Sequence, residues 1–203
     1  MRSIGELLPI RVALVGLALA ILGAAPALAQ GNTLIIASVF TPESLDGDIN
    51  LPGTQNTVVQ VYEGIIRYGR KKNDMGEEVL DSSVVEGHLA ESWTVSPDGK
   101  TVTFNLRRGV KSPFGNEMTA DDWVWSWEKS FHQKRTGNFI ANVSNVVRNG
   151  VEKVDDYTVK FHLGGPSSIL LRALTLYTPS IYDSTVTKEY ATSEHPFAET
   201  WIL

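Results

Sequence analysis

The sequence predicts an α/β protein with a large β-rich region, in which antiparallel strands are combined with helices. Residues 101–106 and 157–163 alternate apolar and polar side chains, which is typical of strands with one buried face. Residues 119–131 instead carry apolar side chains at helical spacing. The chain has 203 residues and 42% hydrophobic composition, which is enough to bury the core of one domain.

The first 29 residues are expected to be a secretory signal peptide and not part of the fold. Arg2 and Arg11 give a basic start, and residues 12–25 carry no charge. Small residues in the sequence A-L-A then precede a cut before Gln30, as signal cleavage requires. The alternative, a spanning helix, needs about 20 apolar residues, more than this run contains.

Cysteine content and net charge restrict the cellular compartment and the classes of partner that we expect. The chain has no cysteine, so it can form no disulfide and has no site for lipid attachment at the cut. We therefore expect a periplasmic protein without a lipid anchor. The net charge is −5, and it becomes −6 when the two Arg and one Glu of residues 1–29 are removed. Such a chain has no basic patch to neutralise phosphates, so we expect no nucleic-acid partner.

The N-terminal part of the mature chain predicts a strand, a helix and a loop. Residues 33–39 form a short apolar run rich in β-branched side chains, which indicates a buried strand. Residues 54–64 predict a helix, because Val58, Val61 and Ile65 fall on one apolar stripe with Tyr62. Residues 69–87 are polar and aperiodic, which favours a solvated loop with at most a short hairpin.

A β-hairpin and a second strand follow. The sequence S-P-D-G-K at residues 96–100 is a strong turn signal, because Pro presets φ and Gly accepts a positive φ. Residues 101–106 then place Val102, Phe104 and Leu106 on one face. Residues 157–163 repeat this alternation and predict another half-buried strand.

The helix over residues 119–131 has a clear start and two faces. Thr119 is the expected N-cap, and an aspartate three residues later completes a capping box. Trp123, Trp127 and Phe131 form an aromatic stripe that should face the core. Trp125 points about 200° away from Trp123, at ~100° per residue, and therefore needs a different partner. Further along, Ser167 is expected to cap a short apolar helix that runs to Leu174, and turns and helix follow Pro179.

Four ordered motifs carry a family resemblance. They are L-A-E-S-W at 89–93, S-P-D-G-K-T at 96–101, T-F-N-L-R-R-G-V-K at 103–111 and M-T-A-D-D at 118–122. Their order and spacing resemble the signature region of the family 5 extracellular solute-binding proteins, which deliver oligopeptides, dipeptides, nickel complexes, haem and some sugars to ABC importers. One departure is S-P-F-G-N at 112–116, which still predicts a turn.

The resemblance implies a periplasmic-binding-protein type 2 fold, in which two lobes enclose the ligand. Residues 30–47 would begin the N-terminal lobe, residues 48–177 would form a β-rich subdomain, and residues 178–203 would return into the lobe. That lobe is expected to be incomplete and the second lobe absent. The implied partners are a peptide or another small solute and the ABC permease subunits, with a monomeric receptor that needs no cofactor.

The expected ligand contacts lie in two places. Val39, Phe40, Thr41 and Pro42 follow the first predicted strand, and open α/β sheets bind ligands outside the carboxyl ends of their strands. Trp125 is the other candidate, because the resembling family often has an aromatic side chain near the ligand at the matching place. The alternatives are an ordinary connecting loop and a second core-facing side of the helix.

No catalytic or metal site is expected. His88, His132, His162 and His195 lack metal-ligand spacing and are expected on the surface, and no nucleophile motif is present. The leading hypothesis is therefore a peptide-binding receptor. Two alternatives stay open: a truncated, binding-incompetent remnant of such a receptor, because half a clamshell buries less of its ligand, and, more remotely, a small exported hydrolase.

Overall fold

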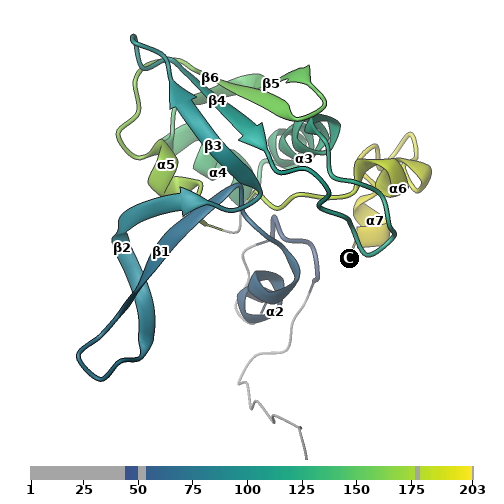
Figure 1. Cartoon of the computed structure of the whole chain (residues 1–203). Coiled ribbons are helices and arrows are strands. Elements are labelled where there is room, and N and C mark those ends of the chain that lie inside the picture. The colour runs from purple at the N-terminus through teal and green to yellow at the C-terminus, as the bar shows by residue number, and fades with distance from the viewer. Residues whose placement is uncertain (1–43, 50–53, 177–178, 203) are drawn as a thin grey trace, which may run out of the picture. The chain divides into compact units, whose positions relative to one another are not determined.

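The computed structural model describes residues 44–49, 54–176 and 179–202 (Figure 1). All of them belong to one compact unit, which spans Ser38–Leu203. The expected signal peptide, the strand predicted over residues 33–39 and the candidate ligand loop at residues 39–42 lie outside the described residues. Those three expectations therefore remain predictions.

A four-stranded antiparallel sheet with the order β3-β4-β6-β5 forms the centre of the unit. Its strands are β3 (Ala90–Val95), β4 (Thr101–Leu106), β5 (Val146–Asp155) and β6 (Thr158–Leu163). The predicted hairpin is confirmed, because β3 and β4 flank the turn whose Gly99 has a φ of 67°. The alternation predicted for β4 and β6 is also confirmed: Phe104, Val159 and Phe161 are fully buried on one face.

Helix α3 (Ala120–Gln133) lies beside the sheet (Figure 1). Its aromatic stripe belongs to the same buried core as the apolar face of β4 and β6. Trp123, Trp127 and Phe131 are all buried, as the sequence predicts. The ring of Phe161 lies between two of its neighbours, with centroids 5.1 Å from Trp127 and 5.2 Å from Phe104. The ring planes are tilted or edge-on, which is the arrangement that aromatic quadrupoles favour. These rings make the interface between helix and sheet.

The start of α3 is fixed by the predicted capping box. The Asp122 carboxylate accepts a hydrogen bond from the backbone N–H of Thr119 at 2.8 Å. Its other oxygen accepts from the backbone N–H of Ser184 at 2.8 Å, at the beginning of α6 (Ser184–Glu189). One buried aspartate thus satisfies donors at the ends of two helices and holds α6 beside α3.

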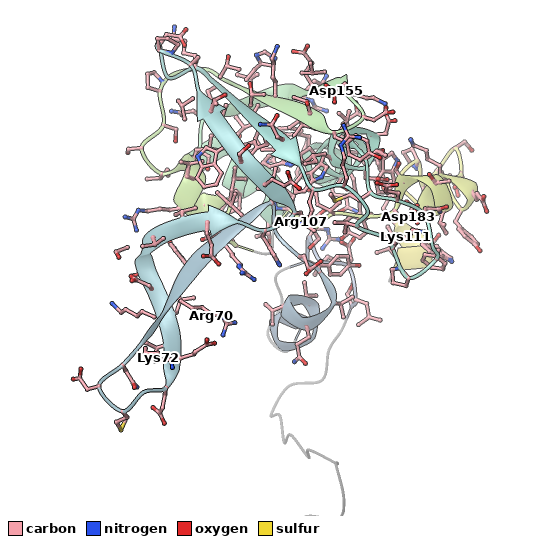
Figure 2. The ribbon with its side chains drawn as sticks, in the orientation of Figure 1. Arg70, Lys72, Arg107, Lys111, Asp155 and Asp183 are labelled. Carbon is pink, nitrogen blue, oxygen red and sulfur yellow. The ribbon has the colours of Figure 1, made fainter. Side chains whose placement is uncertain are left out.

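Residues 66–87 correct the prediction of a mainly loop segment. They form a long antiparallel hairpin of β1 (Ile66–Lys72) and β2 (Glu78–Gly87), in which Arg70 and Lys72 extend from the ribbon (Figure 2). Much of both faces is exposed to solvent, so the sequence carries no apolar alternation to reveal the strands. The Asn73 side-chain oxygen closes the turn by accepting hydrogen bonds from the backbone N–H groups of residues 75 and 77.

The first described helix is shorter than predicted. Helix α2 spans Thr54–Val61, and Val61, which the predicted stripe placed on the apolar face, is 64% exposed. Ile65 is buried as expected, but it lies beyond the helix, where its carbonyl accepts the backbone N–H of Ala90 at 2.9 Å. The apolar stripe at helical spacing therefore combined the short helix α2 with the residues that lead into β1.

The remaining helices are short. Helix α4 (Thr136–Val143) and strand β5 are not predicted by the sequence pattern, and α5 covers only Leu170–Ala173. The N-cap position of α5 is Ile169, so the expected cap at Ser167 is wrong. After Pro179 the chain forms α6 and α7 (Glu199–Ile202), in agreement with the predicted mixture of turn and helix. No helix in the described ranges is long and apolar enough to cross a lipid bilayer.

Phe161→Ala should lower the free energy of unfolding by about 3–5 kcal/mol, because it empties the space between Trp127 and Phe104. Phe139→Ala is the matched control: Phe139 is 61% exposed, so the change should stay within about 0.5 kcal/mol. Urea unfolding followed by circular dichroism measures both. Equal losses in the two variants would contradict the assigned core.

Candidate functional site

The most unusual local feature is a fully buried ion-pair cluster around Lys129 of α3. The Lys129 side chain has no exposed surface, and its Nζ lies 2.8 Å from Asp46 Oδ1 and 2.9 Å from Asp48 Oδ2. Tyr182 donates its hydroxyl to Asp46 Oδ1 at 2.6 Å, and Ser130 donates to Asp48 at 2.9 Å. Burying such charges is costly unless they are paired and hydrogen-bonded, and here both conditions are met.

A tight turn over residues 44–49 aims both carboxylates at the same ammonium. The backbone N–H of Asp48 donates to Asp46 Oδ1 at 3.0 Å, which closes an Asx turn. Gly47 between them is required by close approach: a Cβ at this position would lie 1.9 Å from Ser180 Oγ. The sequence Asp-Gly-Asp therefore packs two acids into the interior, where a larger central residue would not fit.

Burial and charge act in opposite directions on the two acids. Burial alone would raise the pKa of Asp46, but the Lys129 charge and hydrogen bonds from Lys129, Tyr182 and the Asp48 backbone hold that pKa below its usual range. For Asp48, complete burial prevails and raises the pKa, and the neighbouring Asp46 charge adds to the rise. Two acids face one ammonium, so the charge of Asp46 and the charge of Lys129 act in opposite directions on the pKa of Asp48.

The cluster also shifts the pKa of its tyrosine, Tyr182. Burial, followed by the negative charges of Asp48 and Asp46, raises the pKa of Tyr182 well above its usual value. Tyr182 therefore remains a hydroxyl that donates to Asp46 over the working pH range. Burial and the charge of Asp46 likewise raise the pKa of Tyr62, whose ring centroid lies 5.1 Å from that of Tyr182.

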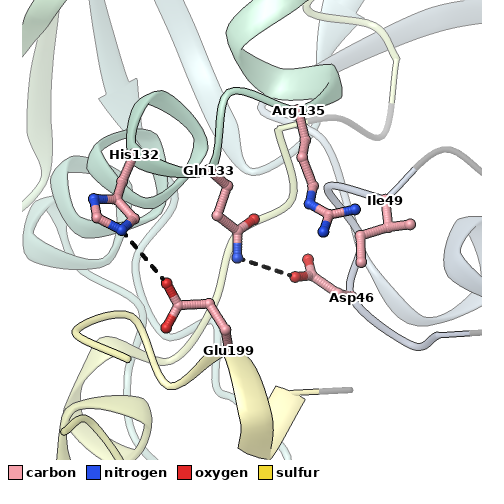
Figure 3. A pocket seen from close by; sticks show the side chains of 6 residues that line it. All are labelled: Asp46, Ile49, His132, Gln133, Arg135 and Glu199. Atoms are coloured by element: carbon pink, nitrogen blue, oxygen red, sulfur yellow. Dashed lines mark hydrogen bonds and ion pairs between the residues drawn. The ribbon is translucent and has the colours of Figure 1, made fainter. Parts of the chain in front are cut away.

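A cavity of about 280 Å³ opens beside this cluster (Figure 3). Asp46 and Ile49 line it from the N-terminal turn, and Gln133, Arg135 and His132 line it from the end of α3 and the start of α4. Glu199 contributes from α7. The Gln133 amide bridges the cavity and the buried cluster, because Nε2 donates to Asp46 Oδ2 at 3.4 Å and Oε1 accepts from Lys129 at 3.2 Å.

The side of the cavity towards α7 is held by ion pairing and ring contact. Glu199 Oε1 lies 3.7 Å from His132 Nε2, and its other oxygen lies 4.0 Å from His195 Nδ1. The His132 ring packs on Phe197 with centroids 5.0 Å apart. Both histidines are about half exposed, as expected for surface residues, but no sequence pattern indicates that they share one carboxylate. No group of three or more His, Asp or Glu side chains in the described ranges is arranged to hold a metal ion.

Trp125, the predicted ligand contact on α3, lies in a second small core beside this region. It is 5% exposed, and its ring centroid lies 6.0 Å from Tyr182 and 5.5 Å from Phe197. Ala198 and Ile202 belong to the same buried cluster. The packing of Trp125 therefore agrees with the alternative that α3 has a second core-facing side. Contact between Trp125 and a ligand stays a prediction.

Sequence reasoning did not find the ion-pair cluster, although one signal for it exists. Lys129 lies four residues after Trp125, on the face of α3 opposite the Trp123 stripe. That face carries an aromatic residue and a cation together, so the cation needs a buried partner if the aromatic is covered. The partners come from residues 81 and 83 positions away in the sequence, which no local pattern reveals.

Comparison with known proteins defines the class. Residues 84–201 match the family described as "Bacterial extracellular solute-binding proteins, family 5 Middle". The match covers more than half of the chain, and the fold agrees with solved structures of periplasmic binding proteins. The chain therefore belongs to the family 5 bacterial extracellular solute-binding proteins, as the signature motifs predicted.

Individual relatives share moderate identity. The chain is 31% identical over 179 residues to the dipeptide-binding protein of Escherichia coli, covering 80% of this chain and 31% of that protein. It is 29% identical to haem-binding protein A of Haemophilus influenzae, covering 81% and 30%. The chain thus spans about a third of the length of these relatives.

Solved structures of similar fold have different ligands. Haemophilus influenzae OppA in complex with the peptide RPPGFSPFR superposes with a TM-score of 0.63 at 22% identity, over 80% of this chain and 31% of that one. AgaA of A. tumefaciens R10, in complex with agropinic acid, gives 0.58 at 29% identity, over 75% and 28%. The fold that these residues adopt is therefore shared by receptors for chemically distinct solutes.

Lys129→Met should lower the free energy of unfolding by about 3–5 kcal/mol at neutral pH, because it leaves two buried carboxylates without their cation. Without Lys129, burial raises the pKa of both acids above the unfolded value. Protonation then stabilises the folded variant, so its deficit against the parent should shrink as pH falls from 7 towards 5. Urea unfolding at several pH values measures this.

Two further variants distinguish charge imbalance from simple loss of packing. Lys153→Met removes a surface ammonium that contacts Asp121 and Asp156, and should leave the unfolding midpoint close to that of the parent. Adding Asp46→Asn and Asp48→Asn to Lys129→Met should recover part of the lost stability. A deficit that is the same at every pH and is not relieved by these amides would rule out the charge explanation.

Proposed function

We propose that this chain is part of a periplasmic solute-binding receptor of an ABC importer and that it captures peptides or a peptide-like solute. The observation that carries the proposal is the family match over residues 84–201. Several relatives are named for dipeptides, di- and tripeptides or oligopeptides, and two oligopeptide-binding relatives are named as periplasmic. The haem-binding relative shows that the family also includes another solute class.

The cavity beside α3 supports a peptide-like solute. A peptide presents apolar side chains, hydrogen-bonding amides and charged ends, and ligand sites combine apolar walls with a few convergent polar groups. Here the Gln133 amide and the Arg135 guanidinium line the same space as the apolar side chain of Ile49. Aromatic side chains lie nearby, since Phe197 packs on His132 at the cavity wall.

Export, anchoring, oligomeric state and catalytic activity are also part of the proposal. We propose export by the signal peptide, release without a lipid anchor, action as a monomer that docks on permease subunits, and no catalytic activity. The hydrolase alternative gains no support from the relatives, which are solute-binding proteins. The binding-incompetent remnant remains the competing proposal, and ligand titration of the chain separates it from a working receptor.

Within this proposal the ligand contacts are those predicted from the sequence, Val39 to Pro42 and Trp125. The Phe197 ring lies between Trp125 and the cavity wall, since it contacts both the Trp125 ring and that of the cavity residue His132. A ligand at the cavity would therefore act on the indole through the Phe197 ring. The loop of Val39, Phe40, Thr41 and Pro42 is proposed to contribute from the end of the first predicted strand.

Calorimetric titration of the chain should detect di- or tripeptides and give no heat with haem or a nickel chelate. The physical reason is the mixed lining of the cavity, which offers hydrogen bonds and charge and no metal-ligand set among the described residues. Binding of haem or the nickel chelate in place of every peptide would sink the peptide proposal but leave the receptor class intact. Binding of none of them would favour the remnant.

Peptide binding should change the tryptophan fluorescence, and Trp125→Phe should remove most of that change. Phenylalanine keeps an aromatic ring against Tyr182 and Phe197, so the variant should fold. Trp93→Phe is the matched control, because Trp93 lies on the edge strand β3 and packs near Phe104, in the main core. A full ligand response in Trp125→Phe would show that Trp125 does not sense the ligand.

A further inference from the structure

We infer that Asn149 is a modification site, at which the side-chain amide is lost by deamidation through attack of the Gly150 backbone nitrogen. Both residues belong to β5, an edge strand of the four-stranded sheet (Figure 1). The inference goes beyond the proposed function and does not depend on which solute the chain binds. It follows from the reasons why the fold needs this pair of residues, taken with the chemistry of an asparagine that precedes a glycine.

The backbone at position 149 favours asparagine. Asn149 has a left-handed φ of 57°, a region that L-residues avoid except for glycine and short polar residues such as asparagine. Its side chain is exposed, and it forms no hydrogen bond within residues 44–49, 54–176 and 179–202. The amide of Asn149 is therefore open to water and able to turn towards the next peptide group.

Close packing requires glycine at position 150. A Cβ there would lie 2.6 Å from the Val147 carbonyl oxygen and 2.9 Å from the His162 carbonyl oxygen. Both contacts are backbone atoms, which cannot move aside as the end of a flexible side chain can. Because Gly150 has no side chain, nothing shields its nitrogen from the neighbouring amide. The fold thus imposes both members of a chemically labile pair.

The register of β5 leaves this pair out of the regular ladder. The pairing with β6 moves from Val146 opposite Leu163 directly to Val151 opposite Phe161. Residues 147–150 therefore lie opposite a single residue of β6, which makes this stretch a bulge. Val146 and Val151 are both buried, so the ends of the bulge are held while the residues between them can change conformation.

The reaction balances with water as the only other reactant. The nitrogen of Gly150 loses its proton and forms a bond to Cγ of Asn149, while the bond from Cγ to Nδ2 breaks. The side-chain nitrogen leaves as ammonia, and a five-membered succinimide ring remains. Water then opens the ring at one of its two carbonyls, which gives aspartate or isoaspartate. One water is consumed, one ammonia is released, and the chain gains one negative charge.

Asn145 provides an internal comparison. It is also exposed and has a similar φ of 63°. However, the next residue is Val146, whose branched and buried side chain shields the backbone nitrogen that would have to attack. The amide of Asn145 is also held, because its Nδ2 donates to the Pro166 carbonyl at 3.4 Å. The same chemistry should therefore be much slower at Asn145 than at Asn149.

The two products should differ in their effect on the fold. Aspartate keeps the length of the main chain and places its carboxylate where the exposed amide was. Isoaspartate adds a methylene group to the main chain directly before Gly150, where the packing already excludes a Cβ. We expect Asn149→Asp, which reproduces the first product, to unfold at a urea midpoint close to that of the parent. The isoaspartate form should unfold at a lower midpoint.

The test is to age the folded chain in mildly alkaline buffer, which favours removal of the attacking proton, and to follow deamidation by mass spectrometry. Trypsin cleavage after Arg148 places Asn149 and Asn145 on separate peptides. We expect the peptide that begins at Asn149 to deamidate at least about tenfold faster than Asn145. A protein isoaspartate methyltransferase should label the aged chain at position 149.

A variant and a denatured sample complete the experiment. Asn149→Gly accepts the same φ and lacks the amide, so the acidic product and the methyltransferase label should both disappear from this position. If this variant fails to fold, the comparison of the two asparagines in the parent still decides. Equal rates at Asn149 and Asn145, or deamidation of Asn149 only when the chain is aged in urea, would overturn the inference.

Discussion

The Lys129 ammonium is the group on which the arrangement of the described residues depends. It lies in the interior with two carboxylates, which reach it only if the turn at residues 44–49 is in place. Tyr182 donates to the same Asp46 and thereby joins the segment before α6 to that turn. Three parts of the chain are thus held by one hydrogen-bonded ion-pair cluster, whose cost of desolvation is offset only when all of them are present.

The sequence predicted those elements whose hydrophobic pattern is one-sided. The β3–β4 hairpin, β6 and α3 bury one face each, and residues such as Phe104 and Trp127 mark that face at the expected period. The β1–β2 hairpin exposes much of both faces, so no period marks it. The helix predicted over residues 54–64 is longer than α2, because Val61 continues the apolar spacing although its side chain is exposed.

The candidate site could be predicted only in part, for a related reason. The family motifs identified the class of protein, but the cavity is formed by residues from three separate regions, represented by Asp46, Arg135 and Glu199. No local pattern brings these together, since their proximity depends on the buried cluster and on the turn between α3 and α4. Trp125 was recognised as a residue that needs its own partner, and Tyr182 and Phe197 provide that packing.

The sequence separation within the Lys129 cluster has a consequence for biosynthesis. Asp46 and its hydrogen-bond donor Tyr182 are 136 positions apart. At a translation rate of about 5–20 residues per second, roughly 7–27 s pass between the addition of the one residue and the other. During that interval the two acids lack part of their set of hydrogen-bond donors. Asp46 can therefore gain its complete set of partners only after the strands and α3 have been synthesised.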